Sequence, residues 1–318
     1  MFTAAQRIDG NKILFSADGD IWPFHFKTGA IDDEFPKSID DHWVGGPSRV
    51  DAIVRGQGNR KDKLYLFNGF EYWRVDLDTD TVDAGYPRPI FGNWPGLWAG
   101  DIDGAVTHPE DNKLYFFRGT DYIRYDFDTG TDAGFPHPIA QDWPGLTGPF
   151  DCVMQGAGSR DKKLYFFKDD DYWRWDIPKS ALDHGYPKKI EPNWRGLRRL
   201  FAMRDADGFG ASTAPTHWPN LNRRTLVREL KETLKDPNLI RQRGTPFCGP
   251  AALLYVMVKE RPREYVDLVR QLFETGQCQM RTKTMEPSLA VQRTTNEKNT
   301  RQVDWIAMAS MRDAANAI

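Results

Sequence analysis

The chain has 318 residues, of which 40% are hydrophobic, 28% charged and 13% aromatic, a size that allows two domains, each with a core of its own. This composition excludes collagen, a wholly disordered chain and a bundle of membrane helices, because no run of roughly 18 or more apolar residues is present to cross a bilayer. The net charge of −2 argues against nucleic acid as the main partner.

Charge and aromatic residues are unevenly distributed along the chain. Residues 1–200 contain 25 Lys/Arg against 32 Asp/Glu, whereas residues 201–318 contain 18 against 13. Nine of the eleven tryptophans also lie in the first 200 residues. Two segments of different composition are most simply two domains. The three cysteines, Cys152, Cys248 and Cys278, are too few and too scattered to form a disulfide framework.

A unit of about 50 residues is repeated four times in the first 200 residues. The runs LYLFNGFEYWRVD, LYFFRGTDYIRYD and LYFFKDDDYWRWD begin at Leu64, Leu114 and Leu164, and a degenerate first copy begins at Lys12. Each run reads as short aromatic strands joined by a Gly/Asp turn. Several such strands per unit predict a four-bladed β-propeller. One tryptophan recurs in phase in every copy, which assigns these rings to core and inter-blade packing; they are Trp43, Trp94, Trp143 and Trp194.

The combination of LYFF, DYWRW, GYP and NWPGL resembles the hemopexin-like repeat. Four copies are similar to the hemopexin-like domain, a four-bladed propeller that also occurs in matrix metalloproteinases, vitronectin and the bacterial photopexins. The resemblance implies a propeller over residues 1–203, with blades at about 1–49, 50–101, 102–149 and 150–203. That family usually closes its ring with a disulfide, and neither place has a Cys here. We therefore expect closure by packing, or by a strand from residues 199–202.

The resemblance also implies an ion in the channel at the centre of the propeller. Backbone carbonyls at the start of each innermost strand would bind calcium or sodium, with a second level two residues further on. Hard cations prefer such oxygen ligands. The alternative is that the aspartates at these positions only satisfy neighbouring backbone groups. The matching positions are Thr3, Asp51, Asp103 and Asp151, then Ala5, Ile53, Ala105 and Val153.

Haem binding is a separate hypothesis from the same resemblance. Haem iron needs an axial ligand, most often His. The five histidines of the propeller do not share one repeat position, and the chain has only one propeller. His217, outside the propeller, is then the leading candidate, and haem binding remains a second alternative.

The C-terminal part is predicted to be mainly helical. Residues 204–220 are rich in Gly, Pro, Ser and Thr and indicate a linker. Leu226, Leu230 and Leu234 recur at helical spacing, and similar patterns predict helices at 222–235, 249–260, 262–276 and 303–317, with a polar loop over 281–301. The predicted fold class is therefore multidomain: an all-β propeller followed by a mainly α-helical module over 221–318.

Cys248 is predicted at the start of an apolar helix, where the helix N-terminus favours a thiolate. Gln242, six residues upstream, could donate to an oxyanion. This spacing resembles the N-terminal part of papain-like cysteine peptidases and related effector domains, which implies Cys248 as nucleophile and Gln242 as oxyanion donor. The alternative is a structural Cys at a helix start. No His follows His217, so the base that such an enzyme needs is missing from the expected place, and the module is predicted to be incomplete and inactive.

The main functional hypothesis is a binding protein whose propeller, with a structural ion, presents a surface to a protein or extracellular-matrix-like ligand. The alternative is a cysteine hydrolase whose propeller recruits the substrate. The N-terminus has no apolar region typical of a signal peptide, so we expect the protein in the cytoplasm or exported without a classical signal.

Overall fold

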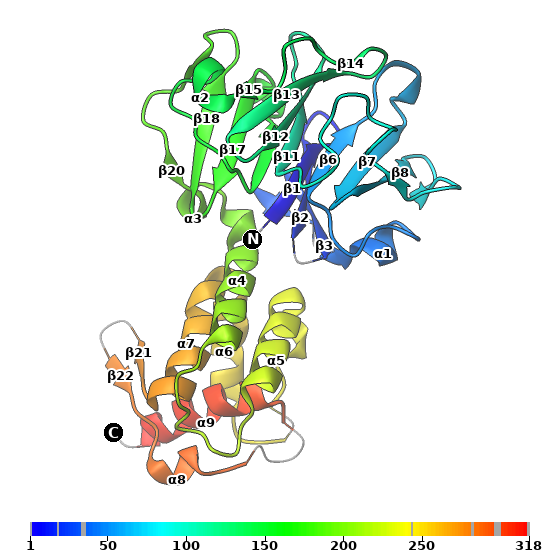
Figure 1. Ribbon diagram of the computed structural model, residues 1–318. Helices are drawn as coiled ribbons and strands as arrows, with labels where there is room; N and C mark the ends of the chain where they lie inside the picture. The colour runs from blue at the N-terminus through cyan, green and yellow to red at the C-terminus, as the bar shows by residue number, and fades with distance from the viewer. Residues whose placement is uncertain are drawn as a thin grey trace. The chain divides into compact units, whose positions relative to one another are not determined.

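The structure, a computed structural model, describes residues 2–17, 19–32, 36–242, 244–280, 283–295 and 300–316. It divides into two units, Met1–Gly196 and Leu197–Ile318. The first is built of strands and the second mainly of helices (Figure 1). Within the described ranges, no helix combines the length and the apolar character that a membrane span requires.

The first unit is the predicted four-bladed propeller. Each blade is an antiparallel sheet of strands that follow one another in the chain. Blade one holds β1 (Phe2–Arg7), β2 (Lys12–Ala17), β3 (Asp20–His25), β4 (Ala30–Ile31) and β5 (Lys37–Ser38). Blade two holds β6 (Ala52–Arg55), β7 (Lys63–Asn68), β8 (Glu71–Asp76), β9 (Thr81–Val82) and β10 (Arg88–Pro89). Blade three holds β11 (Gly104–Thr107), β12 (Leu114–Arg118), β13 (Asp121–Asp126), β14 (Gly130–Thr131) and β15 (His137–Pro138). Blade four holds β16 (Cys152–Gln155), β17 (Lys163–Lys168), β18 (Asp171–Asp176), β19 (Ala181–Leu182) and β20 (Lys188–Lys189).

A two-residue turn joins the second and third strands of each blade. In blade two the turn is Gly69-Phe70, because Asn68 pairs with Glu71. The first turn residue has a positive φ in blades two, three and four, at 57° for Gly69, 58° for Gly119 and 56° for Asp169. Hairpin turns of this length require that conformation, which Gly adopts freely and Asp tolerates. The Gly/Asp turn chemistry expected from the sequence is therefore confirmed.

The recurring tryptophan of each blade packs between that blade and the next. Trp94 lies 5.0 Å from Phe67 of its own blade and 5.7 Å from Phe116 of blade three, measured between ring centroids. Trp194 of blade four lies 6.3 Å from Phe15 of blade one. The assignment of these rings to inter-blade packing is thus confirmed.

Packing closes the ring between blades one and four. Phe15 and Phe167 meet edge to face with centroids 6.2 Å apart, and the Gly158 N–H donates to the Gly10 carbonyl at 3.0 Å. The alternative of a closing strand at residues 199–202 is wrong, because these residues belong to helix α4 (Arg198–Ala211). Their apolar side chains, among them Leu200 and Phe201, are buried.

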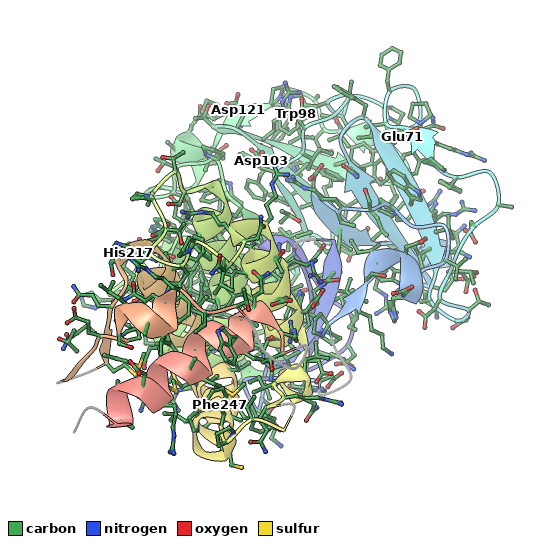
Figure 2. The ribbon with its side chains drawn as sticks, turned by 90° about the horizontal axis from the view of Figure 1, so that it is seen from below. Glu71, Trp98, Asp103, Asp121, His217 and Phe247 are labelled. Carbon is green, nitrogen blue, oxygen red and sulfur yellow. The ribbon has the colours of Figure 1, made fainter. Side chains whose placement is uncertain are left out.

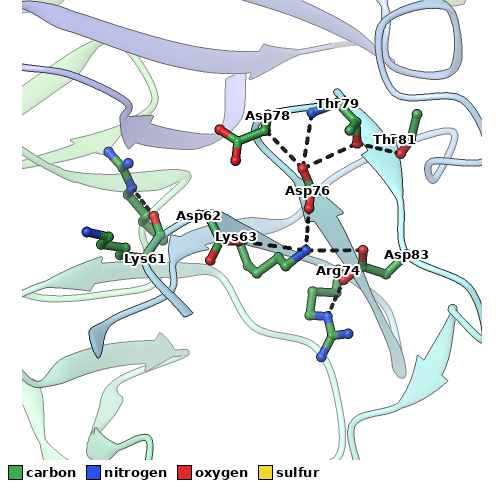
Figure 3. Close-up of polar contacts among 10 residues, drawn as sticks. Lys61, Asp62, Lys63, Arg74, Asp76, Asp78, Thr79, Thr81 and Asp83 are labelled. Carbon is green, nitrogen blue, oxygen red and sulfur yellow. Dashed lines mark hydrogen bonds and ion pairs between the residues drawn. The ribbon is translucent and has the colours of Figure 1, made fainter. Parts of the chain in front are cut away.

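An ion-pair network that the sequence analysis did not single out recurs on the blades. In blade two, Lys63 at the start of β7 contacts Asp76 and Asp83, and Arg74 donates from Nε to Asp83 (Figure 3). The Lys–Asp pair across the same strands recurs in the other blades as Lys12–Asp32 (2.8 Å), Lys113–Asp132 (2.6 Å) and Lys163–Asp183 (2.9 Å). In blade one, Pro23 and His25 stand at the positions of Arg74 and Asp76.

The second unit contains the helices expected from the sequence. They are α5 (Arg223–Lys235), α6 (Cys248–Glu260), α7 (Pro262–Thr275) and α9 (Gln302–Asn316). Helix α4 makes the first half of the expected linker, residues 204–211, helical, and the boundary between the units lies at Gly196/Leu197. The expected polar loop over 281–301 contains β22 (Lys283–Met285), which pairs with β21 (Cys278–Met280), and the short α8 (Leu289–Gln292).

Arg301 joins α5 to the start of α9. Its guanidinium donates to Thr233 Oγ1 at 2.8 Å and to the Glu229 carbonyl at 2.6 Å. The Glu229 carboxylate in turn accepts from the Val303 N–H at 3.0 Å. By contrast, α6 leaves Leu253 and Val256 about half exposed, so one face of this apolar helix is uncovered within the described part of the chain.

Candidate binding site at the end of the propeller channel

The four innermost strands, β1, β6, β11 and β16, lie side by side around the propeller axis. Because they run in the same direction, their first residues meet at one end of the channel. This end holds a cavity of about 710 Å³. We call it the acidic mouth; its lining includes Thr3, Arg49, Asp51, Asp101, Asp103 and Asp151.

Three aspartates of the acidic mouth each anchor the turn of their own blade. Asp51 accepts from the Gly69 N–H at 2.9 Å, Asp103 from Gly119 at 2.5 Å, and Asp151 from Asp169 at 2.6 Å. The donors are the turn residues with positive φ. These contacts agree with the structural role that the sequence analysis kept open for the aspartates. They also hold the rim of the mouth in one conformation.

The acidic mouth concentrates negative charge. Burial raises the pKa of Asp103, the charges of Asp101 and Asp51 raise it further, and the Gly119 N–H opposes them. Burial likewise raises the pKa of Asp151. Both shifts mean that the ionised form is disfavoured here, so a cation close to these carboxylates would stabilise them.

Of the residues predicted for the two ion levels, Asp51, Asp103 and Asp151 lie directly before their innermost strands, and the other five lie on those strands. Thr3 donates from Oγ1 to the Val50 carbonyl. Within the described ranges, no three His, Cys, Asp or Glu side chains form a cluster that could hold a metal. An ion in the channel would therefore depend on backbone carbonyl oxygens. At the second level, no side chain could act as a ligand. The side chains at this level are apolar and buried: Ala5, Ile53, Ala105 and Val153.

The opposite end of the channel differs in chemistry. A cavity of about 460 Å³ lies where the same strands end, and Arg7, Arg55 and Gln155 line it. Arg7 donates to the Gly156 carbonyl at 3.2 Å and Arg55 to the Ile8 carbonyl at 2.8 Å. We call this end the basic mouth; the sequence analysis did not single out these residues.

The histidines considered for haem have local partners. His25 contacts Asp32, His108 lies 3.2 Å from Asp111, and His137 lies 2.8 Å from Asp142. His217 belongs to the helical unit, where its N–H donates to the Phe273 carbonyl at 2.8 Å. None of these contacts joins two histidines, so the geometry adds no support for haem binding.

Cys248 and Gln242 do come together in the helical unit. Cys248 is the first residue of α6 and is exposed, and its thiol donates to Gln242 Oε1 at 3.1 Å. The amide oxygen, rather than the amide NH₂, therefore faces the sulfur. Figure 2 shows His217 well away from Phe247, the residue before Cys248.

The other two thiols are inaccessible. Cys152 is fully buried in β16, and burial holds its pKa well above the ordinary value. Burial raises the pKa of Cys278 to about 11. Cys248 is thus the cysteine that solvent and reagents can reach.

Comparison with known proteins agrees with the geometry of the first unit. The Hemopexin family profile matches residues 50–99, 102–148 and 158–199. The chain is 36% identical over 97 residues to Matrix metalloproteinase-27 of Homo sapiens, which covers 30% of this chain and 18% of that protein. It is also 36% identical over 100 residues to Vitronectin of Sus scrofa, covering 31% and 20%. The chain therefore spans about a fifth of the length of these relatives.

Solved structures of plant proteins share the fold. The hemopexin fold protein CP4 from cow pea has a TM-score of 0.53 at 21% identity, covering 63% of this chain and 98% of that one. The seed albumin LS24 from Lathyrus sativus has a TM-score of 0.55 at 18% identity, covering 63% and 97%. The chain thus carries hemopexin repeats, and its propeller is a four-bladed hemopexin fold.

Proposed function

We propose that the protein is a binding and interaction protein whose propeller presents the acidic mouth and its surrounding turns to a protein or matrix-like ligand. The observation that carries the proposal is the open 710 Å³ mouth, whose three strand-start aspartates are held by backbone N–H groups of the turns. Carboxylates engaged in this way suit recognition better than proton transfer, because their geometry is fixed before a ligand arrives.

The proposal includes a structural calcium or sodium ion in the channel. The raised pKa values of Asp103 and Asp151 support it, since burial disfavours both ionised carboxylates more than the nearby positive charges favour them. Backbone oxygens at Thr3, Asp51, Asp103 and Asp151 would hold the ion, which would supply charge neutralisation and no chemistry. Calorimetric titration of chelator-treated protein with calcium, and separately with sodium, tests it. The D103N/D151N variant should bind the ion more weakly, because it removes the negative charge that the ion would neutralise, whereas D128N, at an exposed position, should bind as wild type does.

Site-specific photo-crosslinking of the full chain tests the binding function. A benzoylphenylalanine replaces Ser48, which is exposed and lines the acidic mouth, or Ser159, which is exposed in the turn Gly158–Arg160. At position 48 we expect a crosslinked adduct with the bound ligand, of one defined mass, whose yield saturates and falls when unmodified protein is added. At position 159 we expect no adduct. Adducts that are equal at both positions, or that do not saturate, would contradict the proposal.

A second candidate function, a cysteine hydrolase, rests on the contact between Cys248 and Gln242. The thiol would need a base from elsewhere, because His217 is the last histidine of the chain and lies apart from it. Thiol labelling across a range of pH, described below, separates this candidate from a structural cysteine.

A further inference from the structure

Blade two exposes two phenylalanines at positions where the other blades have small or polar residues. Phe70 is 66% exposed and Phe91 is 79% exposed. The second turn residue of every blade accepts a hydrogen bond from an isoleucine N–H, which makes the blades directly comparable: Ile39 to Gly19, Ile90 to Phe70, Ile139 to Thr120 and Ile190 to Asp170. The residues after these isoleucines are Asp40, Phe91, Ala140 and Glu191.

The comparison among blades shows that folding does not require these rings. Three blades form the same turn and the same hydrogen bond with Gly, Thr or Asp in place of Phe70. Burial of an apolar ring stabilises a fold, so two largely exposed rings contribute little to the stability of blade two and are free to be covered by a partner. Exposed apolar side chains gathered at one place mark interaction surfaces.

The backbone segments that carry the two phenylalanines are hydrogen-bonded to each other close to the acidic mouth. The Ile90 N–H donates to the Phe70 carbonyl at 2.9 Å, which places Phe91 one residue from that contact. The Gly69 N–H, just before Phe70, donates to Asp51, and the Gly69 carbonyl accepts from the Asp101 N–H at 3.3 Å. The turn that carries Phe70 is thus hydrogen-bonded to two residues of the acidic mouth, Asp51 and Asp101.

The neighbouring loop holds Phe70 in place. A Cβ on Gly100 would lie 2.5 Å from Cδ1 of Phe70, so the ring packs directly on this glycine. Trp98, two residues earlier, is half-buried, and the Arg118 guanidinium lies 5.6 Å from its ring centroid. A ring fixed before binding loses little conformational entropy when a partner covers it. We name Phe70, Phe91 and Trp98 the blade-two rim.

The charges around the blade-two rim are mainly negative. Asp51, Asp101, Asp103 and Asp151 line the mouth together with Arg49, and Glu71, adjacent to Phe70, is exposed (Figure 2). Arg118 is the positive charge beside Trp98. The five carboxylates outnumber the cationic side chains near them, which are Arg49, Arg118 and Lys168. This balance favours a basic partner, and the rings favour one with apolar side chains.

We propose that the blade-two rim and the acidic mouth together bind a basic polypeptide segment in which lysine or arginine alternates with large apolar residues. The apolar side chains cover Phe70 and Phe91, and the cationic side chains face the carboxylates of the mouth. The proposal rests on the proposed binding function and names the ligand class and the part of the propeller that receives it.

Fluorescence anisotropy with the full chain tests the rim. The probe is a fluorescein-labelled peptide of alternating lysine and leucine, with two matched peptides in which glutamate replaces lysine or serine replaces leucine. The key variant is F70T/F91A, which installs the residues that blade three carries and therefore keeps a turn known to fold. V44A is the matched control, because Val44 is also an exposed apolar residue, at 70%, but lies away from Phe70. Val44 forms a β-bridge with Thr81. Thr81 pairs with Asp76, at the opposite end of β8 from Phe70.

Wild-type protein and V44A should bind the lysine–leucine peptide alike, and F70T/F91A should bind it about tenfold or more weakly, as for an interface hot spot. The two matched peptides should bind weakly to all three proteins. Equal affinity for wild type and F70T/F91A would overturn the blade-two rim but leave the binding function standing. Wild-type protein that does not bind the lysine–leucine peptide but gives a specific crosslinked adduct at position 48 would overturn the proposed ligand class and leave the binding function standing. A dimer in sedimentation velocity that F70T/F91A abolishes would show instead that a second copy covers the rim.

Discussion

Lys163 and Asp183 form an ion pair across blade four, with Nζ 2.9 Å from Oδ1 although twenty residues separate them. Asp183 also accepts from Arg174, and Lys163 lies 2.7 Å from Asp176. The pair ties the start of the second strand to the segment that follows the outermost hairpin. The same Lys–Asp pair recurs in all four blades, so the repeat encodes an ion pair between strands as well as an aromatic core.

We expect Asp183→Asn to destabilise the propeller by about 1–3 kcal/mol, because Arg174 loses its charged partner and Lys163 loses one of its two. Guanidinium unfolding followed by tryptophan fluorescence measures the change. Asp128→Asn is the matched control: Asp128 is 82% exposed and pairs with Arg60 on the surface, where an ion pair contributes about 0–1 kcal/mol. Equal effects of the two substitutions would contradict a stabilising role for the Lys163–Asp183 ion pair.

Acid should weaken the same networks. The hydrogen bond from Lys63 lowers the pKa of Asp76 to about 2, and backbone N–H groups assist. Burial alone would raise the pKa of Asp183, but Lys163 and Arg174 lower it overall. A carboxylate with a depressed pKa stabilises the fold above its unfolded pKa of about 3.9, and this stabilisation is lost as pH falls through the folded pKa.

We therefore expect the free energy of unfolding to drop between about pH 4 and pH 2, and to drop less in Asp76→Asn. Asp103 acts in the opposite sense: its pKa is raised, so its protonation stabilises the fold as pH falls towards about 4. Asp103→Asn should accordingly remove a penalty that is present at neutral pH. Denaturant unfolding at a series of pH values checks both signs, and a pH-independent difference between either variant and wild type would contradict the assignment.

Thiol counting should find one reactive cysteine in the folded protein. Cys248 is exposed, whereas Cys152 and Cys278 are buried, so a thiol reagent should label one equivalent quickly and all three only in denaturant. Cys248→Ala should abolish the fast phase. Repeating the measurement from about pH 4 to pH 9 then separates the two roles of Cys248. Labelling that begins only near the ordinary thiol pKa of about 8.5 indicates a structural cysteine, and fast labelling in acid indicates the hydrolase.

Gly156 should tolerate no side chain. A Cβ there would lie 2.1 Å from the Arg160 carbonyl oxygen, so Gly156→Ala must displace the backbone of the turn after β16. We expect a loss of about 1–3 kcal/mol, typical of overpacking. Gly10→Ala is the control, because nothing lies within 4 Å of a Cβ at Gly10. A stability of Gly156→Ala equal to that of Gly10→Ala would show that the turn rearranges freely.

The propeller could be predicted from the sequence because four copies supply the same information four times. Aromatic strands, turn residues and tryptophans each recur at the same positions in the repeat, so a chance pattern is excluded. Helix α4 had no such support. Gly208 and Gly210 lower helix propensity, and the segment reads as a linker. Packing overrides this preference: Phe209 is 1% exposed and lies under the Arg223 guanidinium, 5.0 Å from its ring centroid.

The candidate site was predictable only where the copies agree. Asp51, Asp103 and Asp151 stand at one repeat position and were found. Asp101 and Arg49 were missed, because they line the mouth only once the inner strands are placed around an axis. Phe70 and Phe91 were missed for a different reason: they depart from the other copies, and a search for similarity passes over such departures. The signal was present in the sequence as a difference between blades.

The two ends of the channel differ in charge, so the electrostatic potential changes along the propeller axis. Four carboxylates and one guanidinium group line the end where the inner strands begin, whereas Arg7 and Arg55 with one carboxylate, Asp9, line the end where they stop. A positively charged molecule approaching in solution is drawn to one end and turned away from the other before any contact forms, and the pull weakens within a Debye length of about 8 Å at physiological salt. Ionic strength should therefore act on how fast a basic ligand arrives more than on how long it stays.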